Sequence, residues 1–197
     1  MDDKVTRETF SKDVAEHEMK TIRDDGLYRH LVFAKPGSYC MHFEVVTFPG
    51  YLCYVGDMGS FVFSRIEDMF EFFRGKSINP DYWSEKLLAT DRGDGHTEWS
   101  ADKFRSVIEY YLTERGEPAS QDIREAVEEE ILSLLDDGEH EAYRAAHEFN
   151  HDGFTFDDLW DHNFREFTYR FIWCCYALIW AIGQYDEAKE RTCLTTK

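Results

Sequence analysis

The sequence predicts an α+β fold in which a small antiparallel sheet is followed by a mostly helical C-terminal part. Four short runs rich in aromatic and β-branched residues lie between residues 27 and 64, and helical periodicity governs the chain beyond them. The chain has 197 residues, of which 43% are hydrophobic, enough for a single domain with its own core. We therefore expect one domain over residues 1–197, with a helix and the sheet in 1–75 and a strongly acidic helical part in 76–197.

The first element is predicted to be a helix. An apolar stripe with helical spacing runs along it and is formed by Phe10, Val14, Ala15, Met19 and Ile22. Gly26 is expected to end this helix, because glycine readily takes the positive φ that follows a helical C-terminus.

The next segment is predicted to be a meander of four strands. Its runs are LYRHLVFAKPG, SYCMHFEVVTFPG, YLCYVGDMG and SFVFS, each bounded by glycine or Pro-Gly. If Pro49 and Gly50 form the centre of a tight turn, Cys53 lies opposite Val46 and not opposite Cys40. A disulfide within this hairpin is therefore not expected.

Helix start signals recur after Ser64. Capping motifs are expected at Ser64-Arg65-Ile66-Glu67, Asn79-Pro80, Ser100 and Thr155-Phe156-Asp157-Asp158, the last of which should open the final long helix. A helix is also expected from about Pro118 to Leu135, with apolar residues on one side and acids on another. The uncharged run over 171–185 is expected to be a core helix, with Trp173 and Trp180 facing inward.

The cysteines and the hydropathy of the chain predict its cellular location. The five cysteines form no C-x-x-C pair and follow no signal peptide, which predicts a reduced protein of the cytoplasm. The run over 171–185 is shorter than the roughly 20 residues that cross a bilayer, so no membrane association is expected.

The charge is strongly negative and uneven. The chain has 40 Asp and Glu against 22 Lys and Arg, a formal net charge of −18. Residues 116–162 hold 15 of these acids and only two basic residues, Arg124 and Arg144. Such a field repels nucleic acid and anionic membranes and favours basic partners. A solvated face that keeps the protein dispersed is the simpler alternative.

One motif suggests zinc chemistry. His147-Glu148-Phe149-Asn150-His151 has the form H-E-x-x-H, in which two histidines on one helix face bind zinc and the glutamate activates a water. Asp157 lies where one class of zinc proteases places its third ligand, but that class needs glycine three residues after the second histidine, where this chain has Phe154. We therefore expect no cofactor and no catalytic residues, and keep a zinc metalloprotease as the alternative.

Three stretches resemble small accessory proteins of tailed bacteriophages and prophages. They are FPGYLCYVGDMGSFVFSRIEDMFEFFR, INPDYWSEKL and FREFTYRFIWCCYALIWAIGQYD. The resemblance implies a phage context, in which accessory proteins disarm host defences. It supplies no functional residues.

Together, the implied context and the charge predict a non-enzymatic inhibitor acting in the host cytoplasm. Its carboxylates would imitate nucleic acid in the basic groove of a host defence protein, of the anti-CRISPR or anti-restriction type. The residues expected to bind this partner are Asp122, Glu125, Glu128, Glu129, Asp136, Asp137, Glu139 and Glu141. A second alternative is a phage structural or interaction protein that self-associates, for example as a homodimer through an aromatic surface around Tyr82, Trp83 and Trp99.

Overall fold

The chain forms two compact units. The computed structural model describes residues 4–93, 95–114 and 118–195. The sheet unit comprises Met1–Thr97 and Phe167–Lys197, and the inserted unit comprises Glu98–Glu166. Each unit has its own hydrophobic core. The sequence prediction divided a single domain near residue 75, whereas this division falls at the two ends of an insertion.

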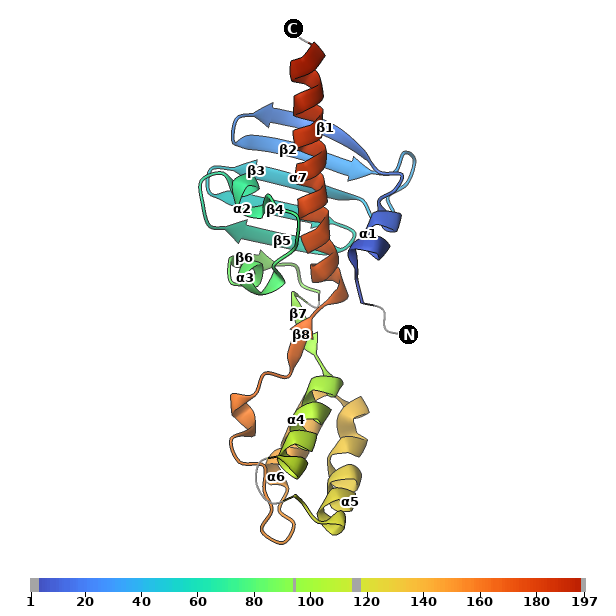
Figure 1. Ribbon diagram of the computed structural model, residues 1–197, viewed down its shortest axis with the longest axis vertical. Coiled ribbons are helices and arrows are strands. Elements are labelled where there is room, and N and C mark those ends of the chain that lie inside the picture. Colours follow the sequence, from blue (N-terminus) through green and yellow to red (C-terminus); the bar gives the residue numbers. More distant parts are fainter. Residues whose placement is uncertain (1–3, 94, 115–117, 196–197) are drawn as a thin grey trace. The chain divides into compact units, whose positions relative to one another are not determined.

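The predicted α+β class is confirmed, with a larger sheet than expected. Six strands form an antiparallel sheet in the order of the sequence (Figure 1). They are β1 (Glu18–Asp25), β2 (Tyr28–Ala34), β3 (Phe43–Phe48), β4 (Tyr51–Gly56), β5 (Gly59–Ser64) and β6 (Leu87–Thr90). The four expected strands are β2 to β5, and β1 and β6 were not predicted.

The register of the central hairpin agrees with the sequence. Phe48 pairs with Tyr51 around the Pro49-Gly50 turn, where Gly50 has φ 85°. Val46 therefore faces Cys53, as predicted. All five cysteines are unpaired.

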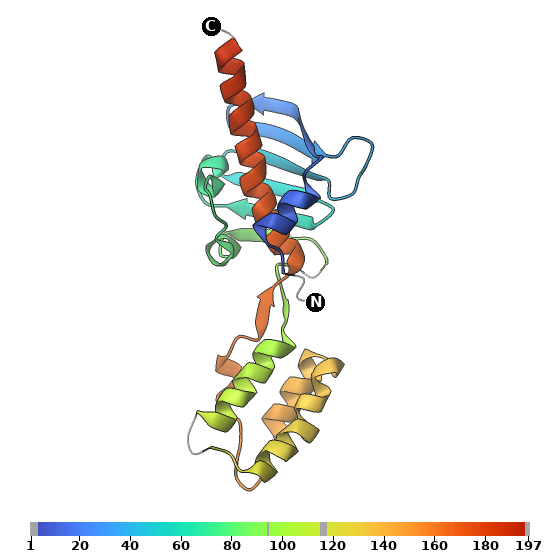
Figure 2. The ribbon, with the colours of Figure 1, turned by 45° about the vertical axis from the view of Figure 1, so that its right-hand side comes forward.

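One face of the sheet packs against the last helix, α7 (Tyr169–Thr195), as the turned view shows (Figure 2). Alternate strand residues such as Phe33 and Phe43 are fully buried, and their rings contact Trp180 and Trp173 of α7. The expected core helix is thus confirmed. Trp173 is completely buried, whereas Trp180 is only partly buried against the same core. Three short helices complete this core: α1 (Arg7–Asp13), α2 (Met69–Phe73) and α3 (Pro80–Ser84).

The predicted N-terminal helix is wrong beyond residue 13. Thr6 caps α1, which ends at Asp13, and the chain then forms strand β1. Gly26, with φ 62°, lies in a two-residue turn that joins β1 to β2 instead of ending a helix. Met19 lies opposite Phe33 and packs against the core, while Ile22 is 51% exposed. Pairing with β2 overrides a weak helical stripe, because the backbone groups of β1 that face β2 find hydrogen-bond partners there.

The helices after the meander are shorter than expected. Asp68, not Ser64, caps α2 by accepting a hydrogen bond from the Phe70 amide. Asn79 caps α3 as predicted, but the helix ends at Ser84. The following Leu87–Thr90 segment pairs with β5 as strand β6, with Leu87 opposite Phe63.

The inserted unit is mainly helical. Its helices are α4 (Ala101–Thr113), α5 (Gln121–Glu130), η1 (Leu132–Asp137), α6 (Glu139–Glu148) and η2 (Leu159–Asp161). Ser100 caps α4 as predicted. The helix expected over 118–135 is divided into α5 and the 3₁₀ helix η1, and Val127, Ile131 and Leu135 face the core.

The predicted start of the last helix is wrong. The Thr155 hydroxyl binds the carboxylate of Asp157, and Asp158 has φ 61°, so no α-helix begins there. Strand β8 (Arg165–Phe167) instead pairs with β7 (Thr97–Trp99). The helix α7 starts only at Tyr169, where the Thr168 hydroxyl accepts a hydrogen bond from the Phe171 amide. Across the described residues, no helix has the length and apolar character needed to cross a membrane.

Candidate functional site

Most of the negative charge of the protein lies in the inserted unit. Residues 98–166 contain 20 Asp and Glu and six Lys and Arg, a net of −14, whereas the sheet unit has 20 acids and 16 basic residues, a net of −4. The sequence prediction placed the excess in 116–162, and the structure assigns that segment to one folded unit. This unit is therefore the candidate site for binding a cationic partner.

The eight acids predicted to bind a partner lie on three consecutive elements. Asp122, Glu125, Glu128 and Glu129 are on α5, Asp136 and Asp137 end η1, and Glu139 and Glu141 open α6. Seven of them are exposed, and Glu141 is partly buried. Their exposure follows from the helical pattern, because Val127 and Ile131 turn inward and leave the intervening positions to solvent.

Some of these carboxylates are already engaged by neighbouring side chains. Asp122 binds His151 at 2.8 Å, Glu128 lies 3.8 Å from Arg105, and Glu139 lies 3.1 Å from Arg165. Glu141 pairs with Arg144.

Other members of this set keep an uncompensated charge. Among the described residues, the one side-chain partner of Glu125 is neutral: the Gln121 amide donates to it at 2.9 Å. Glu129, Asp136 and Asp137 form no ion pair with any residue that the structure describes. Glu125 and these three acids are therefore the most available to an external cation.

The two histidines of the H-E-x-x-H motif do not share a helix face. Helix α6 ends at Glu148, so it includes His147 but not His151. His151 lies in a turn closed by two backbone hydrogen bonds with Phe154, with Asp152 and Gly153 at positive φ. The predicted alternative ligand Asp157 accepts a hydrogen bond from Thr155. The structure therefore does not assemble the zinc set His147, His151 and Asp157.

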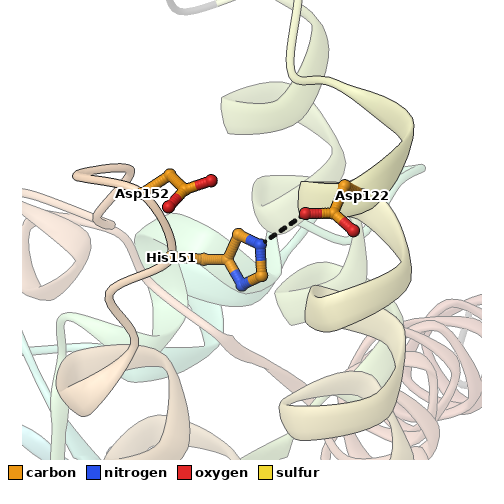
Figure 3. Close-up of side chains that lie close together, drawn as sticks. All are labelled: Asp122, His151 and Asp152. Atoms are coloured by element: carbon orange, nitrogen blue, oxygen red, sulfur yellow. Dashed lines mark hydrogen bonds and ion pairs between the residues drawn. The ribbon is translucent and has the colours of Figure 1, made fainter.

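A different trio does come together, as Figure 3 shows. The ligand atoms of Asp122, His151 and Asp152 lie within 4.8 Å of one another. The fit to a metal is poor, because the Asp122 side chain is 76% exposed and the His151 Nε2 atom is already hydrogen-bonded to it. The hydrogen bond to Asp122 raises the pKa of His151. The contact between His151 and Asp122 ties the 150–154 turn to α5.

An aromatic hollow lies on the outer side of α6. It has a volume of about 720 Å³ and is lined by Glu139, His140, Tyr143, Arg144, His147 and Trp160. We call it the Trp160 hollow. Trp160 and Tyr143 were not among the predicted site residues, although a tryptophan between acidic residues in the segment DDLWDH indicates an exposed aromatic residue.

The aromatic surface suggested for self-association is not formed as expected. Trp83 is buried in the core of the sheet unit, and Trp99 packs against the core of the inserted unit. Tyr82, at 39% exposed, is the most accessible of the three. The thiols of Cys174 and Cys175 are also buried, and burial raises the pKa of both, so they are protonated core residues.

Comparison of the chain with protein families, with curated proteins and with solved structures finds no match. The resemblance to phage accessory proteins therefore stays a prediction.

Proposed function

We propose that the inserted unit is a non-enzymatic protein-binding module that occupies a basic, nucleic-acid-binding groove on another protein. The concentration of a net −14 charge in one folded unit of 69 residues carries this proposal. A charged face needed only to keep the protein dispersed would not have to be confined to one unit.

The electrostatics of nucleic acid explain why a groove is the proposed target. Duplex DNA presents one negative charge per about 1.7 Å of axis, and its binding proteins line their grooves with Lys and Arg. The acids on α5, η1 and α6 offer carboxylates on a rigid, helical scaffold, which can bind the same cations. Binding would exclude the nucleic acid, so the module would act as a competitive inhibitor. The implied phage context makes a host defence protein the proposed target.

A capture experiment with competition tests this proposal. The full-length protein is immobilised, exposed to a bacterial lysate, and washed at physiological ionic strength. We expect it to retain a nucleic-acid-binding protein that added duplex DNA releases. The variant Glu125→Lys, Glu129→Lys and Asp137→Lys, called the inserted-unit reversal, should retain much less of it, because attractive contacts become repulsive.

A matched variant controls for the change in total charge. Glu18, Glu187 and Glu190 are exposed acids of the sheet unit, and their replacement by Lys changes the net charge by the same amount. We call this variant the sheet-unit reversal. It should capture the partner nearly as well as the wild type. Equal loss in both reversals, or a captured protein that DNA does not release, would contradict the proposal.

A further inference from the structure

Trp160 is unusually exposed for a tryptophan in a folded unit. It is 59% accessible, while Leu159 directly before it is only 2% accessible. The short helix η2 explains the difference, because Leu159 anchors it in the core and Asp158, with φ 61°, sets its direction. A large aromatic ring held out in water at a hollow is typical of a binding surface.

The ring of Trp160 is held in place from one side. It forms a T-shaped contact with the His147 ring, with centroids 6.3 Å apart and an angle of 69° between the planes. Tyr143, the other large aromatic of the hollow, is fixed by an edge contact with Phe164, at 6.1 Å and 68°. Each ring thus has one aromatic neighbour that restricts it before any partner arrives, which lowers the entropy lost on binding.

The charges around the hollow are mostly negative. Its single lining arginine, Arg144, is held by Glu141 and lies 3.7 Å from Glu148. Glu139 lines the hollow and pairs with Arg165 at 3.1 Å, and Asp161 lies close enough to Tyr143 to help burial raise the pKa of that phenol. The carboxylates near the hollow thus outnumber the guanidinium groups, and a cation that enters it meets aromatic rings in a field that is negative on balance.

We propose that the Trp160 hollow binds an arginine side chain of the basic partner, with the guanidinium stacked against Trp160. This inference rests on the proposed function and adds to it a contact that contributes binding affinity. Surface carboxylates steer a partner and select it but contribute little affinity each, whereas tryptophan, tyrosine and arginine dominate the energetics of interfaces. A planar guanidinium also suits an aromatic slot better than the compact, strongly hydrated ammonium of lysine.

The test uses the full-length protein and three peptide probes: an arginine octapeptide, a lysine octapeptide and a citrulline octapeptide, which is a neutral analogue of the first. Affinities are measured by calorimetry, and the indole N–H resonance of Trp160 is followed by two-dimensional NMR after assignment with Trp160→Phe. We expect the arginine peptide to shift this resonance in a saturable manner and the citrulline peptide to leave it in place.

Substitutions distinguish the contribution of Trp160 to peptide binding from that of the overall negative charge. Trp160→Ala should weaken binding of the arginine peptide about tenfold and Trp160→Phe by less, as expected for a partly desolvated cation–π contact. Tyr110→Ala removes a 47% exposed aromatic residue of α4 outside the hollow, and should change the affinity less than about twofold.

The outcomes distinguish the two proposals. If Trp160→Ala binds the arginine peptide as tightly as the wild type while the inserted-unit reversal loses binding, the inferred contact with Trp160 is wrong and the proposed function stands. If neither variant loses affinity, both are wrong. An equal effect of Trp160→Ala on the lysine peptide would overturn the assignment to arginine. Circular dichroism melting of each variant establishes that it is folded.

Discussion

Trp173 shows how one residue ties distant segments of the sheet unit together. Its indole N–H donates to the Asp13 carboxylate of α1 at 2.9 Å, and its ring packs edge-on against Phe10 and Phe43. Asp13 and Trp173 are 160 positions apart in the sequence. A fully buried ring with a satisfied polar atom contributes both apolar burial and a hydrogen bond.

We expect Trp173→Ala to lower the free energy of unfolding of the sheet unit by about 3–5 kcal/mol, through the cavity that it leaves. The control is Trp160→Ala, the same chemical change at an exposed position, which should cost less than about 0.5 kcal/mol. Urea unfolding followed by circular dichroism compares the two. Similar midpoints for both variants would contradict the assignment of Trp173 to the core.

His151 gives a residue-level prediction with a defined pH dependence. Its pKa is raised by the hydrogen bond to Asp122, with the charges of Asp122, Asp152 and Glu130 adding to the effect. The contribution of the ion pair to stability is therefore fully present below the ordinary histidine pKa of about 6.5 and is lost as pH rises through the raised value. Asp122→Asn should move the His151 pKa back toward the ordinary value, as measured by NMR titration of its ring protons.

Glu125→Gln is the control for this titration, because Glu125 lies on the same helix but binds Gln121. It should leave the His151 titration close to that of the wild type. If His151 titrates in Asp122→Asn as it does in the wild type, the contact between α5 and the 150–154 turn does not form in solution.

At the scale of elements, the Arg29–Asp68 pair joins strand β2 to helix α2. The two side chains form parallel hydrogen bonds of 2.8 and 2.9 Å, and Arg29 is only 8% exposed. Asp68 also caps α2 through the Phe70 amide, and the Arg29 guanidinium lies over the Phe70 ring at 4.5 Å. Burial alone would raise the pKa of Asp68, but the hydrogen bonds from Arg29 and Phe70 lower it.

Asp68→Asn should therefore lower the free energy of unfolding by about 2–4 kcal/mol, because it leaves a buried guanidinium without its counter-charge. The wild type should lose this stabilisation as pH falls through the lowered pKa of Asp68, since the stabilising form is the carboxylate. Urea titrations at neutral and acidic pH test both points. Glu67→Gln, at an exposed neighbour, should change stability by less than about 0.5 kcal/mol. Equal stability of the two variants at neutral pH would contradict the role of the pair.

The elements that were predicted correctly are those with strong local signals. The strands β2 to β5 alternate buried and more accessible residues between turn sequences, and Ser100 and Asn79 cap helices through their own side chains. The prediction errors concern segments whose conformation depends on pairing with strands that are distant in the sequence. Strands β1 and β6 are both almost wholly exposed, so neither shows the alternation of buried and exposed residues that identifies a strand.

The exposed acids of the candidate site could be predicted from the sequence, but the Trp160 hollow could not. The exposure of the acids on α5 follows from the helical pattern, because they lie on the side of the helix away from the buried residues Val127 and Ile131. The Trp160 hollow depends on η2, whose direction is set by one residue at positive φ, and on α6 ending before His151. No periodicity in the sequence encodes these two turns.

At the scale of the whole molecule, the acidic unit is an insertion into the sheet unit. Its two ends are adjacent, because the Ser100 amide donates to the Phe164 carbonyl at 2.9 Å and β7 pairs with β8. Each unit encloses its own core. Adjacent ends and a separate core are the features that allow one unit to be inserted into another.

Replacing residues 98–166 with a short Gly-Ser linker should leave the sheet unit folded, because the pairs that define its sheet and core all remain. The shortened protein should retain a cooperative melting transition in circular dichroism and should no longer capture the partner. Aggregation or loss of the transition would show that the two units do not fold independently.

The salt dependence of partner binding tests the central claim most directly. We propose to measure Kd for the captured protein between about 50 and about 300 mM salt, with the wild type and the two triple reversals. Affinity of the wild type should fall steeply with salt, since contacts between opposite charges at a nucleic-acid groove are screened. The sheet-unit reversal should keep that steep dependence, and the inserted-unit reversal should bind weakly with a much flatter one. A wild-type affinity that is independent of salt, and is retained in the inserted-unit reversal, would contradict the claim that the inserted unit binds through its carboxylates.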